Sequence, residues 1–133
     1  MPYLNKSQAQ DLASQKLIKS GCNKENSLGI IDGIIDAEFS GIKSHGFHYL
    51  PIYCNHLRIG KIKGKASPTL EQISSSSIRV NADNGFAHTA INIGLKLLCE
   101  MSKNEGISCM SVNNSYNCGV LGFHTKKIAE KNL

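Results

Sequence analysis

The sequence predicts a mixed α/β fold, with helices in the first half and a strand–helix–strand–helix order in the second. Two observations carry this prediction. Apolar residues recur every three or four positions in several long segments, which is typical of helices, whereas short runs near 69–73, 78–81 and 107–112 have strand length. Breaks rich in Gly or Asn separate these segments. With neither a repeat nor a linker in sight, we expect residues 1–133 to form one domain or a portion of one.

The part expected to be helical covers residues 1–60. A first helix is predicted over 5–20 and ends at Gly21. A second starts near Asn23 and is expected to stop near 44–46. Its apolar face comprises Leu28, Ile31, Ile35, Phe39 and Ile42.

A short third helix is predicted next, with Pro51 in its first turn and Gly60 at its end. The part expected to be mixed α/β covers residues 61–133. In it, "NADNG" at 81–85 is a strong turn signal before a long helix over about 85–105.

The end of the chain is expected to hold a strand, a turn and a helix. "ISCMSV" at 107–112 is interpreted as a buried strand, and "NNSYNCG" at 113–119 as the turn that follows it. A final helix is predicted from about Gly119 to the chain end.

Composition and charge exclude some classes of protein. The chain is 41% hydrophobic and 19% charged, as is ordinary for a globular protein, and no apolar run approaches the ~18 residues of a membrane span. The N-terminus lacks the apolar core of a signal peptide, so we expect a cytoplasmic protein with no membrane partner.

The net charge of +5 raises the possibility of a nucleic-acid partner. The densest basic run, "LRIGKIKGK" at 57–65, has no interleaved aromatic residue on which bases could stack. A solvated basic loop is therefore favoured, and no nucleic acid is expected.

The five cysteines are an odd number at wide spacing without a C-x-x-C motif. They are interpreted as reduced thiols, mostly buried as small apolar side chains.

The first candidate site is "SHG", residues 44–46. Histidine exchanges a proton near neutral pH, so His45 is a candidate acid or base. Ser44 can hydrogen-bond the imidazole, and Gly46 would leave the ring accessible. A plain helix-terminal histidine is the alternative. A zinc site with His48 is disfavoured, because no cysteine or carboxylate stands at ligand spacing.

The second candidate is "VNNSYNCGVLGF" at 112–123, where a strand ends and a helix begins at a glycine. Backbone N–H groups at a helix start suit a phosphate or carboxylate. From the motif alone, an ordinary Asn/Gly turn is favoured, and neither G-x-G-x-x-G nor a P-loop is present.

Together these segments resemble a known family. The stretches "SGIKSHGFHYLPIYCNHLRIGKI" and "VNADNGFAHTAINIGLKLLCEMSKNEGISCMSVNNSYNCGVLGF" are similar to the malate/L-lactate dehydrogenase family of the non-Rossmann type. That family includes ureidoglycolate, sulfolactate, diketogulonate and piperideine-2-carboxylate oxidoreductases. The resemblance covers roughly residues 20–131.

The resemblance implies a non-Rossmann α/β fold, usually dimeric, that transfers hydride between NAD or NADP and carbon 2 of a 2-oxo or 2-hydroxy acid. It implies that His45 is the proton donor and that Ser44 supports it. It also implies that the turn from Asn117 to Leu121 lies against cofactor or substrate. The residues of that turn are Asn117, Cys118, Gly119, Val120 and Leu121.

The chain departs from the family pattern in three ways. Tyr49 stands where the pattern S-H-G-x-x-R has an arginine expected to grip the substrate carboxylate, and a tyrosine cannot form a bidentate ion pair. Asn117 stands where N-S-x-H has its histidine. Family members also run to well over twice this length.

Two hypotheses follow. Either the chain is the N-terminal portion of such an oxidoreductase, or it is a catalytically dead remnant that survives as a folded or dimerising module.

Overall fold

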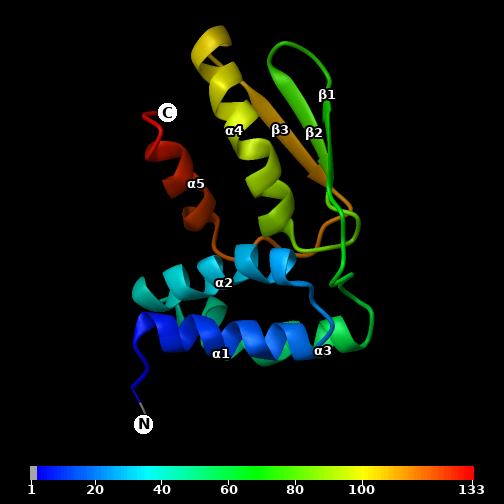
Figure 1. The fold of residues 1–133 in the computed structure, drawn as a ribbon. Coiled ribbons are helices and arrows are strands. Elements are labelled where there is room, and N and C mark those ends of the chain that lie inside the picture. Colours follow the sequence, from blue (N-terminus) through cyan, green and yellow to red (C-terminus); the bar gives the residue numbers. More distant parts are fainter. Residues whose placement is uncertain (1–2) are drawn as a thin grey trace.

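In the computed structural model, which describes residues 3–133, a layer of three helices lies at one end of a small sheet and two further helices (Figure 1). The helices are α1 (Lys6–Lys19), α2 (Lys24–Phe39), α3 (Leu50–Arg58), α4 (Ala87–Glu105) and α5 (Leu121–Ala129). The strands are β1 (Thr69–Gln72), β2 (Ser77–Asn81) and β3 (Cys109–Asn113). This is the predicted mixed α/β order, and the fold class is confirmed.

The first helix forms where the sequence predicts it, because both ends carry strong signals. The Asn5 side chain accepts a hydrogen bond from the Gln8 N–H at 2.9 Å, and the Gln8 side chain accepts one from the Asn5 N–H at 3.0 Å. This capping box pairs two N–H groups that the helix itself cannot. After the helix, Gly21 adopts φ +102°. One face of α1 is buried against α2.

The second helix ends at Phe39, so the predicted end near 44–46 is wrong. Gly41 adopts φ +72°, and the Ile42 N–H bonds back to the Ala37 carbonyl at 2.8 Å, which closes the helix. Two short 3-10 turns, η1 (Lys43–His45) and η2 (Phe47–Tyr49), then lead into α3.

The buried face of α2 agrees in part with the predicted one, since Ile31 and Ile35 are buried as expected. Leu28 is 55% exposed and Phe39 is 74% exposed. The helix contacts α1 on one side and α4 on another, and this buries Ile30 and Ile34 in addition. The isoleucines buried along α2 are Ile30, Ile31, Ile34 and Ile35.

The sheet has the order β1-β2-β3. Strands β1 and β2 are antiparallel, whereas β2 and β3 are parallel, with α4 as the crossover between them. Helix α4 covers one face of the sheet (Figure 1). Strand β3 lies at the edge and is half exposed, so its interpretation as a buried strand is wrong.

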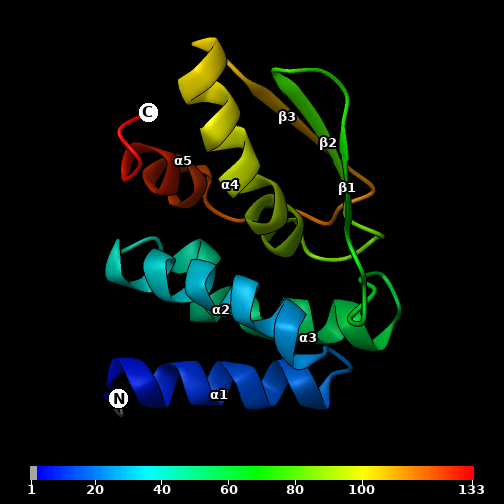
Figure 2. The same ribbon diagram turned by 45° about the horizontal axis from the view of Figure 1, so that its top comes forward.

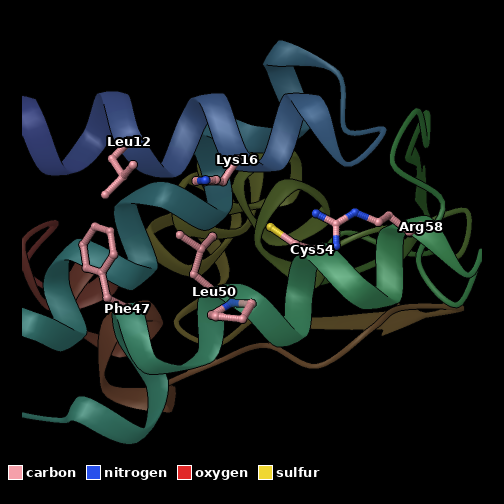
Figure 3. Close-up of a pocket in the computed structure, with 7 residues that line it drawn as sticks. Leu12, Lys16, Phe47, Leu50, Cys54 and Arg58 are labelled. Carbon is pink, nitrogen blue, oxygen red and sulfur yellow. The ribbon is translucent and has the colours of Figure 1, made fainter.

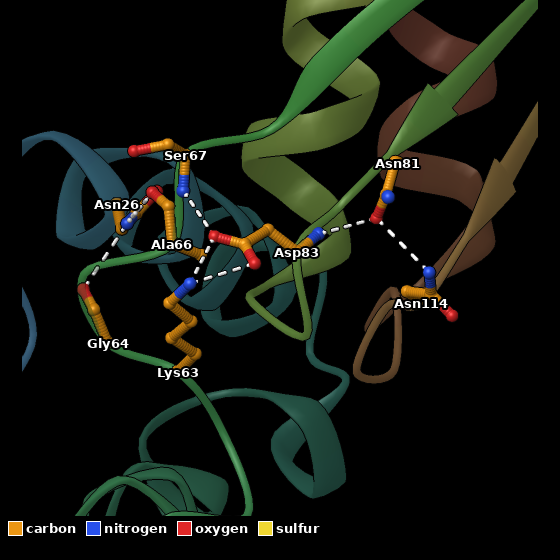
Figure 4. A network of polar contacts seen from close by, with 8 residues as sticks. All are labelled: Asn26, Lys63, Gly64, Ala66, Ser67, Asn81, Asp83 and Asn114. Carbon is orange, nitrogen blue, oxygen red and sulfur yellow. Dashed lines mark hydrogen bonds and ion pairs between the residues drawn. The ribbon is translucent and has the colours of Figure 1, made fainter.

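Polar contacts attach the helical layer to the sheet (Figure 4). The Asn26 amide of α2 donates to the carbonyls of Gly64, at 3.2 Å, and of Ala66, at 2.9 Å. The Lys63 ammonium lies 2.6 Å from the Asp83 carboxylate in the predicted turn. That contact holds the pKa of Asp83 below its usual range.

The segment that precedes α5 runs along the boundary between the two parts of the fold, and none of residues 114–120 is buried. Figure 2 shows α5 beside α4, with α2 on its other side, and the chain between β3 and α5 passes close to both layers. The final helix stops at Ala129, short of the predicted chain end, and Asn132 beyond it has φ +59°. Among residues 3–133, no helix is both long and apolar enough to cross a membrane.

Candidate functional site

The histidine of "SHG" lies at the junction of two helices. His45 is the last residue of η1, between α2 and α3, and it is exposed. The Ser44 hydroxyl lies 3.0 Å from its Nδ1 atom. The ring is therefore anchored through one nitrogen and open to a ligand through the other.

The glycine of this motif has a role that the sequence interpretation missed. The Glu38 carboxylate accepts a hydrogen bond from the Phe47 N–H at 2.6 Å. A Cβ atom on Gly46 would collide with that carboxylate. Gly46 thus makes room for a contact that fixes the turn carrying His45.

Tyr49 connects His45 to the second candidate segment. The Tyr49 ring lies nearly parallel to the imidazole, with an interplanar angle of 7° and centroids 6.2 Å apart. Its hydroxyl accepts a hydrogen bond from the Asn117 amide at 3.4 Å. The Asn117 carbonyl oxygen accepts from the Tyr53 hydroxyl at 3.4 Å and from the Gly119 N–H at 3.3 Å. The structure thus brings Ser44, His45, Tyr49 and Asn117 into one group of contacts, whereas His48 is exposed outside it.

An aromatic cluster under this group was not found from the sequence. Tyr53 is 1% exposed and packs edge-to-face against Tyr49, Phe86 and Tyr116. The Tyr116 hydroxyl lies 2.6 Å from His56 Nδ1. A signal was available, because Tyr53 and His56 lie three residues apart on α3, and Tyr49, just before the helix, lies four residues ahead of Tyr53.

The phenols of this cluster are neutral near pH 7. Burial, and then the nearby Tyr49, raise the pKa of Tyr53 above its usual range. Burial, followed by the Tyr49 hydroxyl, raises the pKa of Tyr116 to about 12. The tyrosines therefore offer hydrogen bonds and no charge.

The turn from Asn117 to Leu121 leads directly into α5. Gly119 adopts φ +66°, a conformation that suits glycine. Val120 is the N-cap residue, and in the part of the chain that the structure describes no side chain caps this helix. Leu121 is 70% exposed. The Phe123 N–H of the first turn donates to the Val120 carbonyl at 3.1 Å, which leaves the Leu121 and Gly122 N–H groups to bind an anion.

Two buried histidines support this turn from below, and neither was singled out from the sequence. His88 of α4 is 1% exposed and His124 of α5 is 9% exposed, with ring centroids 5.1 Å apart. His124 Nε2 lies 2.8 Å from the Cys118 carbonyl oxygen. Burial lowers the pKa of both rings, that of His88 to about 3. No sequence motif marks them, because their burial depends on how α2, α4 and α5 meet.

The cysteines agree with the expected buried thiols in three of five cases. Cys22, Cys54 and Cys99 are buried, whereas Cys109 is exposed and Cys118 is half-buried. Burial raises the pKa of Cys22 to about 12, so that thiol stays protonated.

A separate hollow of about 300 Å³ lies between α1 and α3 (Figure 3). The residues that line it are Leu12, Lys16, Phe47, Leu50, Pro51, Cys54 and Arg58. None of the predicted site residues is among them. Leu50 and Cys54 on α3 face this hollow, whereas Tyr49 and Tyr53 face the His45 group.

The side chains that could bind a metal ion are dispersed in the part of the chain that the structure describes. Residues 3–133 contain no group of three or more His, Cys, Asp or Glu side chains arranged to hold a metal ion.

Comparison with known protein families identifies the class of protein. The model of the malate/L-lactate dehydrogenase family matches residues 4–133, and the chain belongs to this family. The resemblance seen in the sequence is confirmed.

Individual relatives agree with this assignment. The chain is 32% identical over 122 residues to Delta(1)-pyrroline-2-carboxylate reductase 1 of Burkholderia ambifaria, covering 92% of this chain and 36% of the relative. It is 30% identical over 126 residues to (2R)-3-sulfolactate dehydrogenase (NADP(+)) of Chromohalobacter salexigens, covering 95% and 38%. The structure of malate dehydrogenase from Entamoeba histolytica matches with a TM-score of 0.88 and 26% identity, over 98% of this chain and 36% of that one.

The curated relatives are much longer than this chain. The chain spans little more than a third of the length of the curated relatives that it matches.

Proposed function

We propose that this chain supplies the proton-donating part of an oxidoreductase that transfers hydride between NAD(P)H and carbon 2 of a 2-oxo or 2-hydroxy acid. The observation that carries the proposal is the placement of His45. It is exposed and bonded to Ser44, and Tyr49 joins it to the Asn117–Leu121 turn. Membership of the malate/L-lactate dehydrogenase family supports the reaction class.

His45 acts as the acid through Nε2. In the imidazolium, Nδ1–H donates to the Ser44 oxygen and Nε2–H faces outward. When the Nε2 proton passes to the developing alkoxide oxygen, Nδ1–H keeps its hydrogen bond to the Ser44 oxygen. The ring therefore does not turn during proton transfer. For this step Nε2 must come within ~2.6–3.2 Å of the substrate oxygen, directly or through one water.

The residues at the start of α5 fit one part of a dinucleotide. The uncapped N–H groups after Val120 suit a phosphate or carboxylate oxygen, and Gly119 adopts the positive φ that leads the chain into the helix. The cofactor, when bound, supplies or accepts the hydride. NAD and NADP are both compatible with these contacts.

Tyr49 and Asn117 are the proposed substrate contacts beside His45. Both are neutral, so each offers hydrogen bonds to a carboxylate or carbonyl group without an ion pair. The pyrroline-2-carboxylate reductase among the relatives makes a cyclic 2-imino acid a second candidate substrate.

A homodimer is part of this proposal. Helix α2 exposes Leu28 and Phe39, at 55% and 74%, and a second copy could cover such apolar side chains. Sedimentation of a clean monomer at micromolar concentration would contradict the dimer.

The deciding experiment uses the enzyme as its gene encodes it. NADH and NADPH oxidation is measured with 2-oxo acids and cyclic 2-imino acids in His45→Ala and in the matched control His48→Ala. We expect His45→Ala to lose ~10²–10⁴-fold in kcat, as for removal of a general acid, with little change in cofactor affinity. His48→Ala should match the wild type.

Equal activity in both variants would remove His45 from the mechanism. Absence of turnover with every substrate and both cofactors would instead support the alternative of an inactive folded module.

A further inference from the structure

The two buried histidines and the proposed ligand-binding turn form one packing unit. The turn between Cys118 and Leu121 lies over the rings of His88 and His124, and α2 closes the unit from the other side through Gly33. Neither histidine belongs to the group around His45.

His124 makes a directional contact with the turn. Its Nε2 atom lies 2.8 Å from the Cys118 carbonyl oxygen, and a carbonyl can only accept a hydrogen bond. Nε2 must therefore carry a proton. In the neutral ring, this leaves Nδ1 without one.

His88 makes a steric contact with the turn. A Cβ atom on Gly119 would lie 3.0 Å from His88 Nε2, and one on Gly33 would lie 2.8 Å from the same atom. The ring thus fills the space between α2 and the turn, and both glycines are needed to admit it.

The imidazole nitrogens that lack a hydrogen-bond partner indicate that both rings are neutral where they pack under the turn. Within residues 3–133, Nδ1 of His88 and Nδ1 of His124 are buried without a hydrogen-bond partner. Protonation of either ring would place an unpaired N–H and a charge in this apolar unit, close to the Lys127 ammonium. From α2, Asp36 does not compensate them, because it pairs with Lys126 at 3.0 Å.

We propose that His124 and His88 are positioning residues for the 117–121 turn. His124 holds the Cys118 carbonyl through Nε2–H, and His88 forms the floor under Gly119. Together they keep the free N–H groups at the start of α5 oriented toward an anionic group of the ligand. That the turn binds an anionic ligand rests on the proposed function, whereas the positioning of the turn by the two histidines does not.

The test is NMR spectroscopy of this chain. Long-range ¹H–¹⁵N spectra of the imidazoles report which nitrogen carries the proton, and we expect the Nε2–H tautomer for His124. His124→Phe keeps a ring and removes the donor, whereas His124→Gln restores an N–H donor. Loss of one hydrogen bond should speed amide exchange at Gly119 and Phe123 about tenfold in His124→Phe. His124→Gln and the surface control His48→Phe should stay close to the wild type.

A pair of glycine variants tests the packing of the His88 ring under Gly119. Gly119→Ala should shift the ¹⁵N resonances of His88, because its Cβ would meet that ring. Gly122→Ala is the matched control, since its Cβ would meet only Val120 Cγ1, at 3.9 Å. Equal shifts in both variants would overturn the role of His88.

The outcomes separate the two proposals. An Nδ1–H tautomer of His124, or unchanged amide exchange in His124→Phe, would overturn the positioning role whatever the ligand. Titration with NADH, NADPH and pyrophosphate then tests whether the N–H groups at the start of α5 bind an anionic ligand. If His124→Phe loosens the turn but no probe shifts the wild-type amides of residues 119–122, the positioning role stands and the proposed cofactor contact falls.

Discussion

The Asn117 amide donates a hydrogen bond to the Tyr49 hydroxyl over 3.4 Å, and this contact joins the two positions at which the chain departs from its family pattern. At these positions the pattern has an arginine and a histidine, two side chains that carry or gain positive charge. Here a neutral donor meets a neutral hydroxyl. The two departures thus form one contact, and beside His45 they replace charge with hydrogen bonding.

The contact itself is expected to contribute little to stability, because both partners are partly solvated and the distance is long. Tyr49→Phe, which keeps the ring beside His45, should lower the free energy of unfolding by less than ~1 kcal/mol. Tyr53→Ala should lower it by ~3–5 kcal/mol, because it opens a cavity among buried aromatic rings. Urea denaturation of both variants checks this. Similar losses would mean that the aromatic cluster is not the core of this site.

Gly33→Ala is expected to destabilise the protein, against the usual trend in helices. Replacing a helical glycine by alanine normally gains ~0.5–1 kcal/mol. Here the new Cβ would lie 2.8 Å from His88 Nε2 in a buried unit, so we expect a loss of ~1–3 kcal/mol. Gly122→Ala in α5 has open space and should show the normal gain. Thermal unfolding of the two variants measures the difference in sign.

Stability should fall on mild acidification because of His88. Burial lowers its folded-state pKa to about 3 from the usual histidine value of 6.5. The unfolded chain therefore binds a proton below pH ~6.5 that the folded chain does not, and the contribution of His88 is complete only above that pH. Between pH ~6.5 and ~4.5 the free energy of unfolding should fall by ~1.4 kcal/mol per pH unit for this one group.

The control for this pH dependence is His88→Leu, which removes the titrating ring. Its slope over the same window should be clearly flatter. Asp83, whose pKa is also lowered, changes its contribution chiefly below the usual aspartate pKa of 3.8 and so lies outside the window. An equal slope in both proteins would show that His88 is not buried in the neutral form.

The sequence predicted the elements well where local signals decide them. Gly21 after α1, Pro51 in the first turn of α3, and the "NADNG" turn are all local, and the observed elements follow them. The end of α2 was misplaced because apolar periodicity continues through Phe39 to Ile42, whereas Gly41 adopts a left-handed conformation that stops the helix.

The candidate site was predicted only in part, because local signals mark some of its residues and tertiary contacts place the others. His45 and Asn117 stand in short motifs that can be read from the sequence. The burial of His88, and the packing of Tyr53 against Phe86 and Tyr116, arise from tertiary contacts between distant elements. Periodicity gives one face of each helix, but α2 and α4 each pack against more than one neighbour.

This 133-residue chain, expressed alone, is expected to have negligible dehydrogenase activity. It spans 36% of its pyrroline-2-carboxylate reductase relative, so the contacts made by the rest of that relative are not available to it. Loss of an arginine contact to a carboxylate costs ~1.5–3 kcal/mol, and the neutral Tyr49 can offer only a single hydrogen bond in place of a bidentate ion pair. Each missing catalytic group removes a further ~10²–10⁴-fold.

The measurement is NADH and NADPH oxidation with oxaloacetate, pyruvate and a cyclic 2-imino acid, and the blank is the same chain with His45→Ala. We expect the two traces to coincide. Turnover clearly above the His45→Ala blank would show instead that the residues around His45, Tyr49 and the 117–121 turn suffice for catalysis. In that case the neutral Tyr49–Asn117 pair would have to bind the substrate through hydrogen bonds alone.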